Sequence, residues 1–261
     1  MMYDFDPAEV RDVLVSGIQR IARQGNFSKV VVGISGGKDS AVTAALCARA
    51  LGKENVYGVL LPDGNQGDIK DSYAVCQALG IPHITVNIGK IHASLCGALH
   101  HANQFAAHDM DVPASQEANI NVAPRLRMTV LRYITQALGA RLAGTGNLSE
   151  MTVGYCTKDG DTSCDFSVLG DLTSVEVVQV GLTMPEIPRG LVLKTPSDGL
   201  SGMSDEEKLG VSYEDIHKYI RGLEGVPQEA AKKIQEKQKK NAHKRQLPPL
   251  LHYSPTIRDE F

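Results

Sequence analysis

The fold of this chain is indicated first by residues 30–40, which read V-V-V-G-I-S-G-G-K-D-S. A β-branched apolar run leads into a glycine-rich turn at 35–40, and a helical pattern continues to Leu51. Such an order forms an anion site, because glycine lets the backbone approach a phosphate and the first helical N–H groups have no partner. The stretch therefore predicts a phosphate-binding loop. The alternative is an ordinary glycine-rich turn between a strand and a helix.

The loop differs from the kinase-type phosphate loop. That loop needs Ser or Thr after its lysine and a second glycine at a fixed spacing, whereas Asp39 follows Lys38 and Val32 lies five residues before Gly37. The order S-G-G-x-D-S instead resembles the pyrophosphate loop of ATP-α-hydrolases, enzymes that cleave ATP to AMP and pyrophosphate. We therefore expect ATP as a co-substrate.

Strand and helix patterns alternate along the chain. The expected strands are 29–34, 56–61, 83–88 and 141–145, and the expected helices are 7–23, 39–51, 68–79, one ending near Phe105, 121–138, 174–182 and 227–245. This alternation predicts an α/β, Rossmann-like three-layer sandwich with a mainly parallel, doubly wound sheet and flanking helices. Pro124 is expected in the first turn of its helix, and 106–118 is expected to be a mobile loop.

Composition limits the classes of protein that the chain can belong to. Its 261 residues suit one domain, 1–261, in which a C-terminal helix and tail, about 227–261, close over the substrate. A net charge of −3 argues against a nucleic-acid partner, and no apolar run is long enough for a membrane span. Five cysteines without a C-x-x-C pair and the lack of a leader pattern indicate a cytoplasmic location.

A second motif, G-T-G-N-L-S-E at 144–150, follows the fourth expected strand. It reaches the same sheet edge as the phosphate loop, where Thr145 can donate a hydroxyl and Glu150 can supply a hard oxygen ligand. Mg²⁺ usually takes one or two protein carboxylates, and Asp39 and Glu150 are a plausible pair. The alternative is that Asn147 or Ser149 caps a helix and Glu150 only complements its dipole.

The run T-K-D-G-D-T-S-C-D at 157–165 has turn-forming composition. Taken alone it indicates a solvated loop, and its spacing does not match the twelve-residue calcium loop. The function of this run can be interpreted only together with the other motifs. These are, in chain order, S-G-G-K-D-S (35–40), N-V-A-P-R-L-R-M (121–128), G-T-G-N-L-S-E (144–150), G-Y-C-T-K-D-G-D (154–161), K-T-P-S-D-G-L (194–200), D-E-E-K-L-G-V-S-Y (205–213) and H-K-R (243–245).

In this order the motifs closely resemble those of ammonia-dependent NAD⁺ synthetase, a ligase of NAD biosynthesis. The resemblance runs from 29 to 245, whereas pyrophosphate-loop enzymes that make GMP or modify tRNA share only the first motif. It implies ATP-dependent amidation of deamido-NAD⁺ with ammonia through an adenylated intermediate, giving NAD⁺, AMP and pyrophosphate. It also implies a homodimer with active sites near the interface and no nucleic-acid or membrane partner.

The resemblance implies a role for each matching residue. The ATP phosphates are expected to contact Gly33, Ile34, Ser35, Gly36, Gly37, Lys38, Asp39 and Ser40, with Thr145 and Ser197 as further ATP contacts. Deamido-NAD⁺ is expected to contact Arg125, Lys158 and Asp165, with His243 and Lys244 closing over it. Asp39 and Glu150 are the expected Mg²⁺ ligands. The residues expected to act in catalysis are Asp39, Lys38, Lys158 and Asp165.

Several positions depart from the family pattern. Ser174 stands where many members carry an ATP-binding lysine, and Lys38 stands where relatives often have Gln and could supply that contact. Asp159 replaces a usual aromatic residue and Val168 a usual proline. Because no glutaminase domain is recognised, free ammonia is the expected nitrogen donor.

The expected reaction needs no protein nucleophile, because the nicotinate carboxylate itself attacks the α-phosphorus of ATP. Rate would come from aligning two anions and neutralising charge on the leaving pyrophosphate, for which Lys38 and Lys158 are available. Asp165 has two possible roles, orienting the pyridine ring or binding and deprotonating ammonium. Two other classes remain as alternatives: a tRNA-modifying enzyme that adenylates a base, and a nucleotide-binding protein without catalysis.

Overall fold

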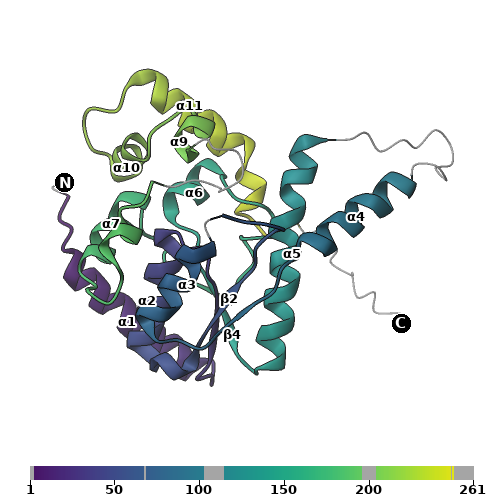
Figure 1. Ribbon diagram of the computed structural model, residues 1–261. Coiled ribbons are helices and arrows are strands. Elements are labelled where there is room, and N and C mark those ends of the chain that lie inside the picture. The colour runs from purple at the N-terminus through teal and green to yellow at the C-terminus, as the bar shows by residue number, and fades with distance from the viewer. Residues whose placement is uncertain (1–2, 68, 103–114, 196–203, 248, 250–261) are drawn as a thin grey trace, which may run out of the picture.

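The computed structural model describes residues 3–67, 69–102, 115–195, 204–247 and 249 (Figure 1). Five parallel strands form one sheet in the order β3-β2-β1-β4-β5. Their bounds are β1 Val30–Gly33, β2 Val56–Leu60, β3 His83–Thr85, β4 Arg141–Gly144 and β5 Phe166–Ser167. The chain leaves β1 toward β2 on one side and later places β4 on the other, so the strand order reverses between β1 and β4. Ligands of open parallel sheets bind at such a reversal.

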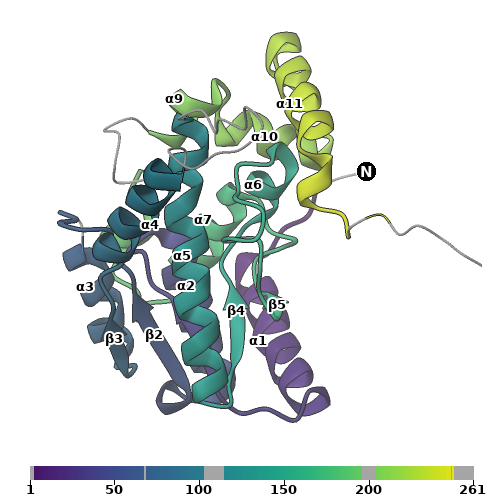
Figure 2. The same ribbon diagram turned by 90° about the vertical axis from the view of Figure 1, so that its right-hand side faces the viewer.

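Helices cover both faces of the sheet. One face carries α1 (Pro7–Gln24), α2 (Lys38–Leu51), α3 (Ile69–Leu79), α7 (Ser174–Leu182) and α8 (Arg189–Val192), with the short η1 (Lys53–Asn55) after α2. The other face carries α5 (Gln116–Ala137), against which α4 (Gly89–Ala102) packs (Figure 2). The expected three-layer α/β fold is therefore confirmed.

The central strand explains why both faces are buried. Val30 and Val32 point into the core beneath α2, and Val31 points into the core beneath α5. All three are fully buried, as expected for a strand whose side chains alternate between two covered faces. Because these valines are packed on both faces, they fix the position of β1 and therefore of the loop that follows it.

A third group of helices lies above the carboxyl edge of the sheet (Figure 1). It contains α6 (Leu148–Val153), α9 (Asp205–Leu209), α10 (Tyr213–Arg221), α11 (Gln228–Lys240) and the 3₁₀ turn η3 (Ala242–Lys244). Helices α6, α9, α10 and α11 share a separate apolar cluster that includes Val153, Leu209, Ile216 and Ile234. The cluster anchors the C-terminal helices over α6, beside the end of β4.

Three sequence expectations need correction. Helix α5 begins at Gln116, where Ser115 accepts a hydrogen bond from the Ala118 N–H, so Pro124 lies inside the helix and not in its first turn. The expected loop at 106–118 is therefore wrong for its last residues, and 106–114 lie outside the described residues. The final helix ends at Lys240 and not at 245, with η3 after it. Strand β5 and helices α8, α9 and α10 were not expected.

Within the described residues, no helix is both long enough and apolar enough to cross a bilayer.

Replacing Ile234 by Ala should lower the free energy of unfolding by about 2–5 kcal/mol, because Ile234 is fully buried in the cluster that holds α11 on α6. Urea denaturation followed by circular dichroism measures this change. The control is Val13→Ala on α1, where the side chain is 62% exposed, and it should change stability by less than about 0.5 kcal/mol. Equal effects of the two substitutions would contradict the packing described here.

Candidate active site

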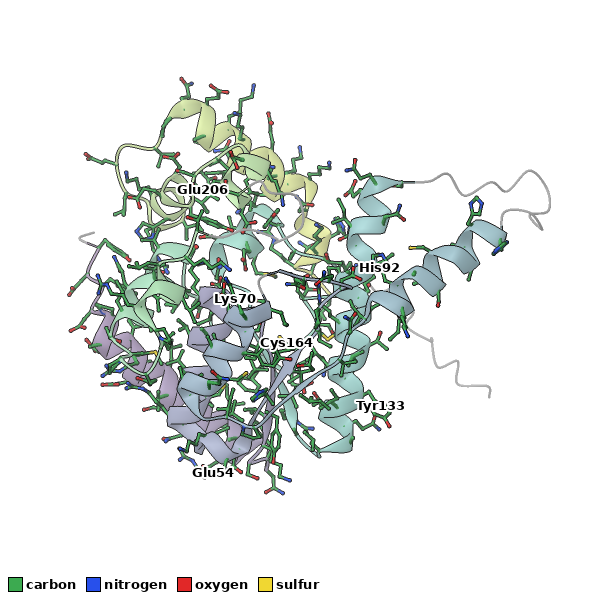
Figure 3. All side chains as sticks on the ribbon, in the orientation of Figure 1. Glu54, Lys70, His92, Tyr133, Cys164 and Glu206 are labelled. Carbon is green, nitrogen blue, oxygen red and sulfur yellow. The ribbon has the colours of Figure 1, made fainter. Side chains whose placement is uncertain are left out.

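A cavity of about 630 Å³ opens at the carboxyl edge of the sheet. Its walls come from the loop after β1, from α5, from the end of β4, from α6 and from the loop that precedes β5. Of the residues expected at the site, it is lined by Gly33, Ile34, Ser35, Gly37, Lys38, Asp39, Thr145, Glu150 and Lys244. Cys164, labelled in Figure 3, also lines the cavity near the centre of the molecule.

The loop at 35–40 is held in shape by its own side chains. The Ser40 hydroxyl donates to the Gly37 carbonyl at 3.0 Å, and the Gly37 N–H donates to the Ser35 hydroxyl at 3.2 Å. Gly36 has a φ of +82°, and a Cβ there would lie 2.8 Å from the Ser72 backbone nitrogen, so only glycine fits. Helix α2 begins without a side-chain cap. Its N-terminus is therefore suited to an anion.

Lys38, Asp39 and Asn147 form a chain of polar contacts, of which Lys38 and Asp39 line the cavity. The Lys38 ammonium lies 2.8 Å from Asp39 Oδ2 and 5.5 Å from the centre of the Tyr213 ring. The Asn147 side-chain amide donates to Asp39 Oδ1 at 3.0 Å. Lys38 and Asn147 are buried. The Asp39 carboxylate therefore has a partner on each oxygen, one of them a cation.

Glu150 caps the helix and also adds a second carboxyl group to the site. Asn147 is the N-cap of α6, and Glu150 Oε2 accepts from the Asn147 N–H at 3.1 Å, which completes a capping box. The structure thus confirms that Asn147 caps this helix, but Glu150 does more than complement the helix dipole, because it also lines the cavity. Enclosure by protein, and secondly the charge of Asp39, raises the pKa of Glu150 from 4.5 to about 8.

The two carboxyl groups fit the chemistry of a magnesium site. Hard oxygen donors suit Mg²⁺, and the ammonium beside Asp39 shows that this position accepts a cation. Among the described residues, no group of three or more His, Cys, Asp or Glu side chains could hold a metal ion. A magnesium ion bound here would therefore need phosphate oxygens and water to complete its coordination.

The loop that precedes β5 places some expected residues differently. The Arg125 guanidinium donates to the Lys158 carbonyl at 3.3 Å, which brings these two residues together, but neither lines the cavity. Asp165 accepts from Arg132 and, at 2.7 Å, from the Leu142 N–H, and these contacts hold the pKa of its carboxyl below the usual value despite partial burial. Asp165 is not among the cavity residues either.

Of the expected C-terminal pair, His243 and Lys244, only Lys244 lines the cavity. The Lys244 ammonium lines the cavity and donates to the carbonyls of Gly154 and Cys156 at 2.9 and 2.8 Å. His243 and the loop residues Gly36 and Ser40 are not among the cavity residues. Ser197 lies outside the described residues.

Several cavity residues were missed by the sequence analysis. Asp161 accepts from the Thr157 N–H at 2.6 Å, and burial raises the pKa of its carboxyl. Asp205 accepts from the Tyr155 hydroxyl at 3.1 Å, and Lys194 pairs with Asp71 at 2.6 Å. Asp161 and Lys194 lie inside motifs quoted above, so their position in a motif was a usable signal. Asp205 is the first residue of the quoted motif D-E-E-K-L-G-V-S-Y (205–213), so the same signal was available for it.

Ser174 takes no part in the cavity. It is buried at the start of α7, and its N–H donates to the Ser149 hydroxyl at 3.0 Å. The position where many relatives carry a lysine therefore serves here to join α7 to α6. The cavity lining includes Lys38, at the start of α2, and Lys194, which pairs with Asp71 of α3.

A parallel sheet with a reversal of strand order, a glycine-rich loop at a helix N-terminus and paired carboxyl groups define an α/β nucleotide-binding protein. The NAD synthase family model matches residues 10–248. The chain belongs to the NAD synthase family, as the resemblance predicted. Ammonia-dependent NAD⁺ synthesis, in which a ligase forms a C–N bond, is the activity that the family and its relatives support.

Individual relatives agree with this assignment. The NH(3)-dependent NAD(+) synthetase of Methanocaldococcus jannaschii is 33% identical over 95% of this chain and 98% of its own. The NH(3)-dependent NAD(+) synthetase of Methanococcoides burtonii is 35% identical over 95% of this chain and 96% of its own. Neither alternative, the tRNA-modifying enzyme or the protein without catalysis, is favoured by these comparisons.

Two solved structures share the fold over nearly the whole chain. NMN synthetase from Francisella tularensis has a TM-score of 0.86 and 28% identity, covering 96% of this chain and 100% of its own. NH3-dependent NAD synthetase from Campylobacter jejuni, in complex with nitrate, has a TM-score of 0.74 and 26% identity, covering 95% of this chain and 100% of its own.

Glu150→Gln should alter the pH dependence of stability when no divalent cation is present. The pKa of Glu150 is about 8 in the folded chain and 4.5 ordinarily. Between pH 4.5 and pH 8, the folded chain therefore keeps the Glu150 proton, whereas the unfolded chain has lost it. The contribution of Glu150 to the free energy of unfolding is therefore complete below pH 4.5 and is lost as the pH rises through 8. Urea denaturation at several pH values should show wild type losing stability relative to the variant across this window. A constant difference would contradict the raised pKa.

Proposed function

We propose that this chain amidates the nicotinate carboxylate of deamido-NAD⁺ with free ammonia, and that ATP drives the reaction. The observation that carries the proposal is the uncapped N-terminus of α2, which opens into a cavity beside Asp39 and Glu150. A triphosphate bound there meets unpaired N–H groups and two lysines.

The reaction has two steps. A carboxylate oxygen of the nicotinate ring attacks the α-phosphorus of ATP, a P–O bond forms, and the bond to pyrophosphate breaks. Ammonia then attacks the carbonyl carbon of this acyl adenylate, AMP leaves with the former carboxylate oxygen, and nitrogen loses a proton. The chain contributes alignment of the reactants and N–H and ammonium groups that stabilise negative charge.

Asp39 and Glu150 would hold Mg²⁺ in this proposal. When bound, the ion neutralises phosphate charge and favours departure of pyrophosphate. Lys38 lies beside this site, and Lys194 lines the same cavity, so both can neutralise phosphate oxygens. Asp39 is therefore proposed as a residue that acts in catalysis through the metal site, and Lys38 through the phosphates.

The substrate contacts implied by the resemblance remain proposals. The phosphate loop, Thr145 and Ser197 are proposed to bind ATP. Arg125, Lys158 and Asp165 are proposed to bind deamido-NAD⁺, with Lys158 and Asp165 acting in catalysis and with His243 and Lys244 closing over the substrate. The position of Lys244 in the cavity wall supports its role. The contact between Arg125 and Lys158 supports a shared site for these two residues.

A second candidate is the same chemistry on the corresponding mononucleotide. The observation that favours it is the close structural similarity to NMN synthetase from Francisella tularensis. The reacting carboxylate belongs to the nicotinate ring in both substrates, and the adenylate half of the dinucleotide contributes only binding energy.

We also propose a homodimer with active sites near its interface. Helix α4 exposes Ile91, Leu95 and Leu99 at helical spacing, with 46%, 38% and 52% of each side chain accessible. Tyr133 projects from α5 away from the sheet and is 76% exposed (Figure 3). Exposed apolar surface of this kind indicates a protein interface. Because α5 also lines the cavity, a partner on this face would lie near the active site.

We further infer a cytoplasmic location and a single functional unit over 1–261. All five cysteines are free thiols, as expected for a reducing compartment. The region 227–261 is proposed to close over the substrate. The contact of Lys244 with the cavity supports this role for the described part of that region.

The direct test is to incubate the full chain with Mg-ATP, deamido-NAD⁺ and ammonium, and to quantify NAD⁺ and AMP. We expect equal amounts of both products, and we expect Asp39→Asn to lower kcat/KM by about 100-fold or more, because it removes charge stabilisation at the leaving pyrophosphate. Asp12→Asn, on the exposed surface of α1, is the control and should retain full activity. Absence of both products from wild type would refute the proposal.

The same assay with nicotinate mononucleotide decides between the two substrates. A higher kcat/KM for the dinucleotide supports the first candidate, and a higher value for the mononucleotide supports the second.

Leu99→Glu should disrupt the proposed dimer, because it places a charge in the exposed apolar row of α4. Light scattering coupled to size-exclusion chromatography should give twice the mass of one chain for wild type and a single-chain mass for the variant at low micromolar concentration. Val13→Glu, on the exposed face of α1, should remain dimeric. A single-chain mass for wild type would remove the dimer from the proposal.

A further inference from the structure

Lys38 combines deep burial with an unusual electrostatic position. Only 4% of its side chain is exposed, although lysine is rarely buried without a partner. It is also the first residue of α2, where the helix dipole disfavours a cation. Some specific interaction must therefore compensate for both effects.

Two groups supply that compensation. Asp39 Oδ2 lies 2.8 Å from the ammonium, and the Tyr213 ring lies 5.5 Å from it, within the range of a cation–π contact. Tyr213 comes from α10, and its hydroxyl is near Asp205 Oδ2 at 3.5 Å. The ammonium is thus held between the phosphate loop and the C-terminal helices.

This pairing places the ammonium on the carboxylate that is proposed to bind magnesium. Asp39 Oδ1 already accepts from Asn147, so Lys38 occupies the other oxygen. A divalent cation that approaches Asp39 would meet a buried positive charge a few ångströms away. Repulsion between such charges is screened only weakly inside a protein.

We propose that the Lys38 ammonium is a built-in counter-ion for Asp39, which occupies the metal position until a nucleotide arrives. The proposal rests on the assignment of Asp39 to the magnesium site. Without nucleotide, the chain then binds divalent cations weakly. A triphosphate in the cavity gives the ammonium new oxygen acceptors, so that Lys38 releases Asp39 as the metal and the nucleotide enter together.

The alternative is a permanent structural ion pair. In that case Lys38 would remain on Asp39 with or without nucleotide, and its removal would leave an uncompensated buried carboxylate and lower stability without improving metal binding. The two interpretations therefore predict different effects of removing the charge.

The test is a titration of the full chain with Mn²⁺ alone, with free Mn²⁺ followed by electron paramagnetic resonance. Lys38→Gln should bind Mn²⁺ at least about tenfold more tightly than wild type, because one competing charge is removed. Lys38→Arg keeps the charge and should bind within twofold of wild type. Circular dichroism checks that each variant is folded, and Lys38→Met, which keeps the apolar stem, replaces Lys38→Gln if the latter unfolds.

Asp39→Asn in the Lys38→Gln background locates the site and should abolish the gain in Mn²⁺ affinity. The inference is overturned if removing the charge changes Mn²⁺ affinity by less than twofold, or if the gain persists after Asp39→Asn. Its failure is distinguishable from failure of the proposed function, because formation of NAD⁺ by wild type is measured separately and needs no tight metal binding by the free chain.

Discussion

The site depends on one constraint: the N-terminus of α2 must remain without a side-chain cap, in the loop that follows the buried valines of β1. Orphan N–H groups in this position are costly unless water or a ligand pairs with them. Here the Ser35 and Ser40 hydroxyls stabilise the turn around the N-terminus without closing it. The fold thereby presents backbone N–H groups suited to an anion, and the surrounding layers hold the loop in place.

Electrostatic balance around this position explains the arrangement of the carboxyl groups. The uncapped start of α2, the glycine-rich loop and the cavity lysines Lys38, Lys194 and Lys244 favour anions, yet Asp39 and Glu150 line the same cavity. The structure reconciles the charges by pairing Asp39 with Lys38 and by raising the pKa of Glu150, so that without ligands little net charge is buried. In the proposed reaction, a nucleotide and its metal would give Lys38 and both carboxyl groups new partners of opposite charge. Substrate binding would then be coupled to this redistribution of charge.

The sequence predicts most of the framework because its signals are local. The apolar run before Gly33 and the glycines after it fix β1, the loop and α2 without tertiary information. Strand β5, at Phe166–Ser167, is too short to show a pattern. The N-cap serines of α9 and α10, Ser204 and Ser212, were readable local signals that the sequence analysis did not use, whereas the apolar cluster that packs these short helices was not readable. The cavity positions of Asp161 and Asp205 result from burial between distant elements. Periodicity and composition carry no signal for such contacts.

The C-terminal segment is part of the site because it satisfies the backbone of α6. Carbonyl groups at the end of a helix need donors, and those of Val153 and Gly154 receive them from Asn241 and Lys244. Gly154 approaches Asn241 too closely to carry any side chain, so this contact requires glycine. Since Asn147, the N-cap of α6, donates to Asp39, the two ends of one short helix connect the C-terminal segment to the phosphate loop.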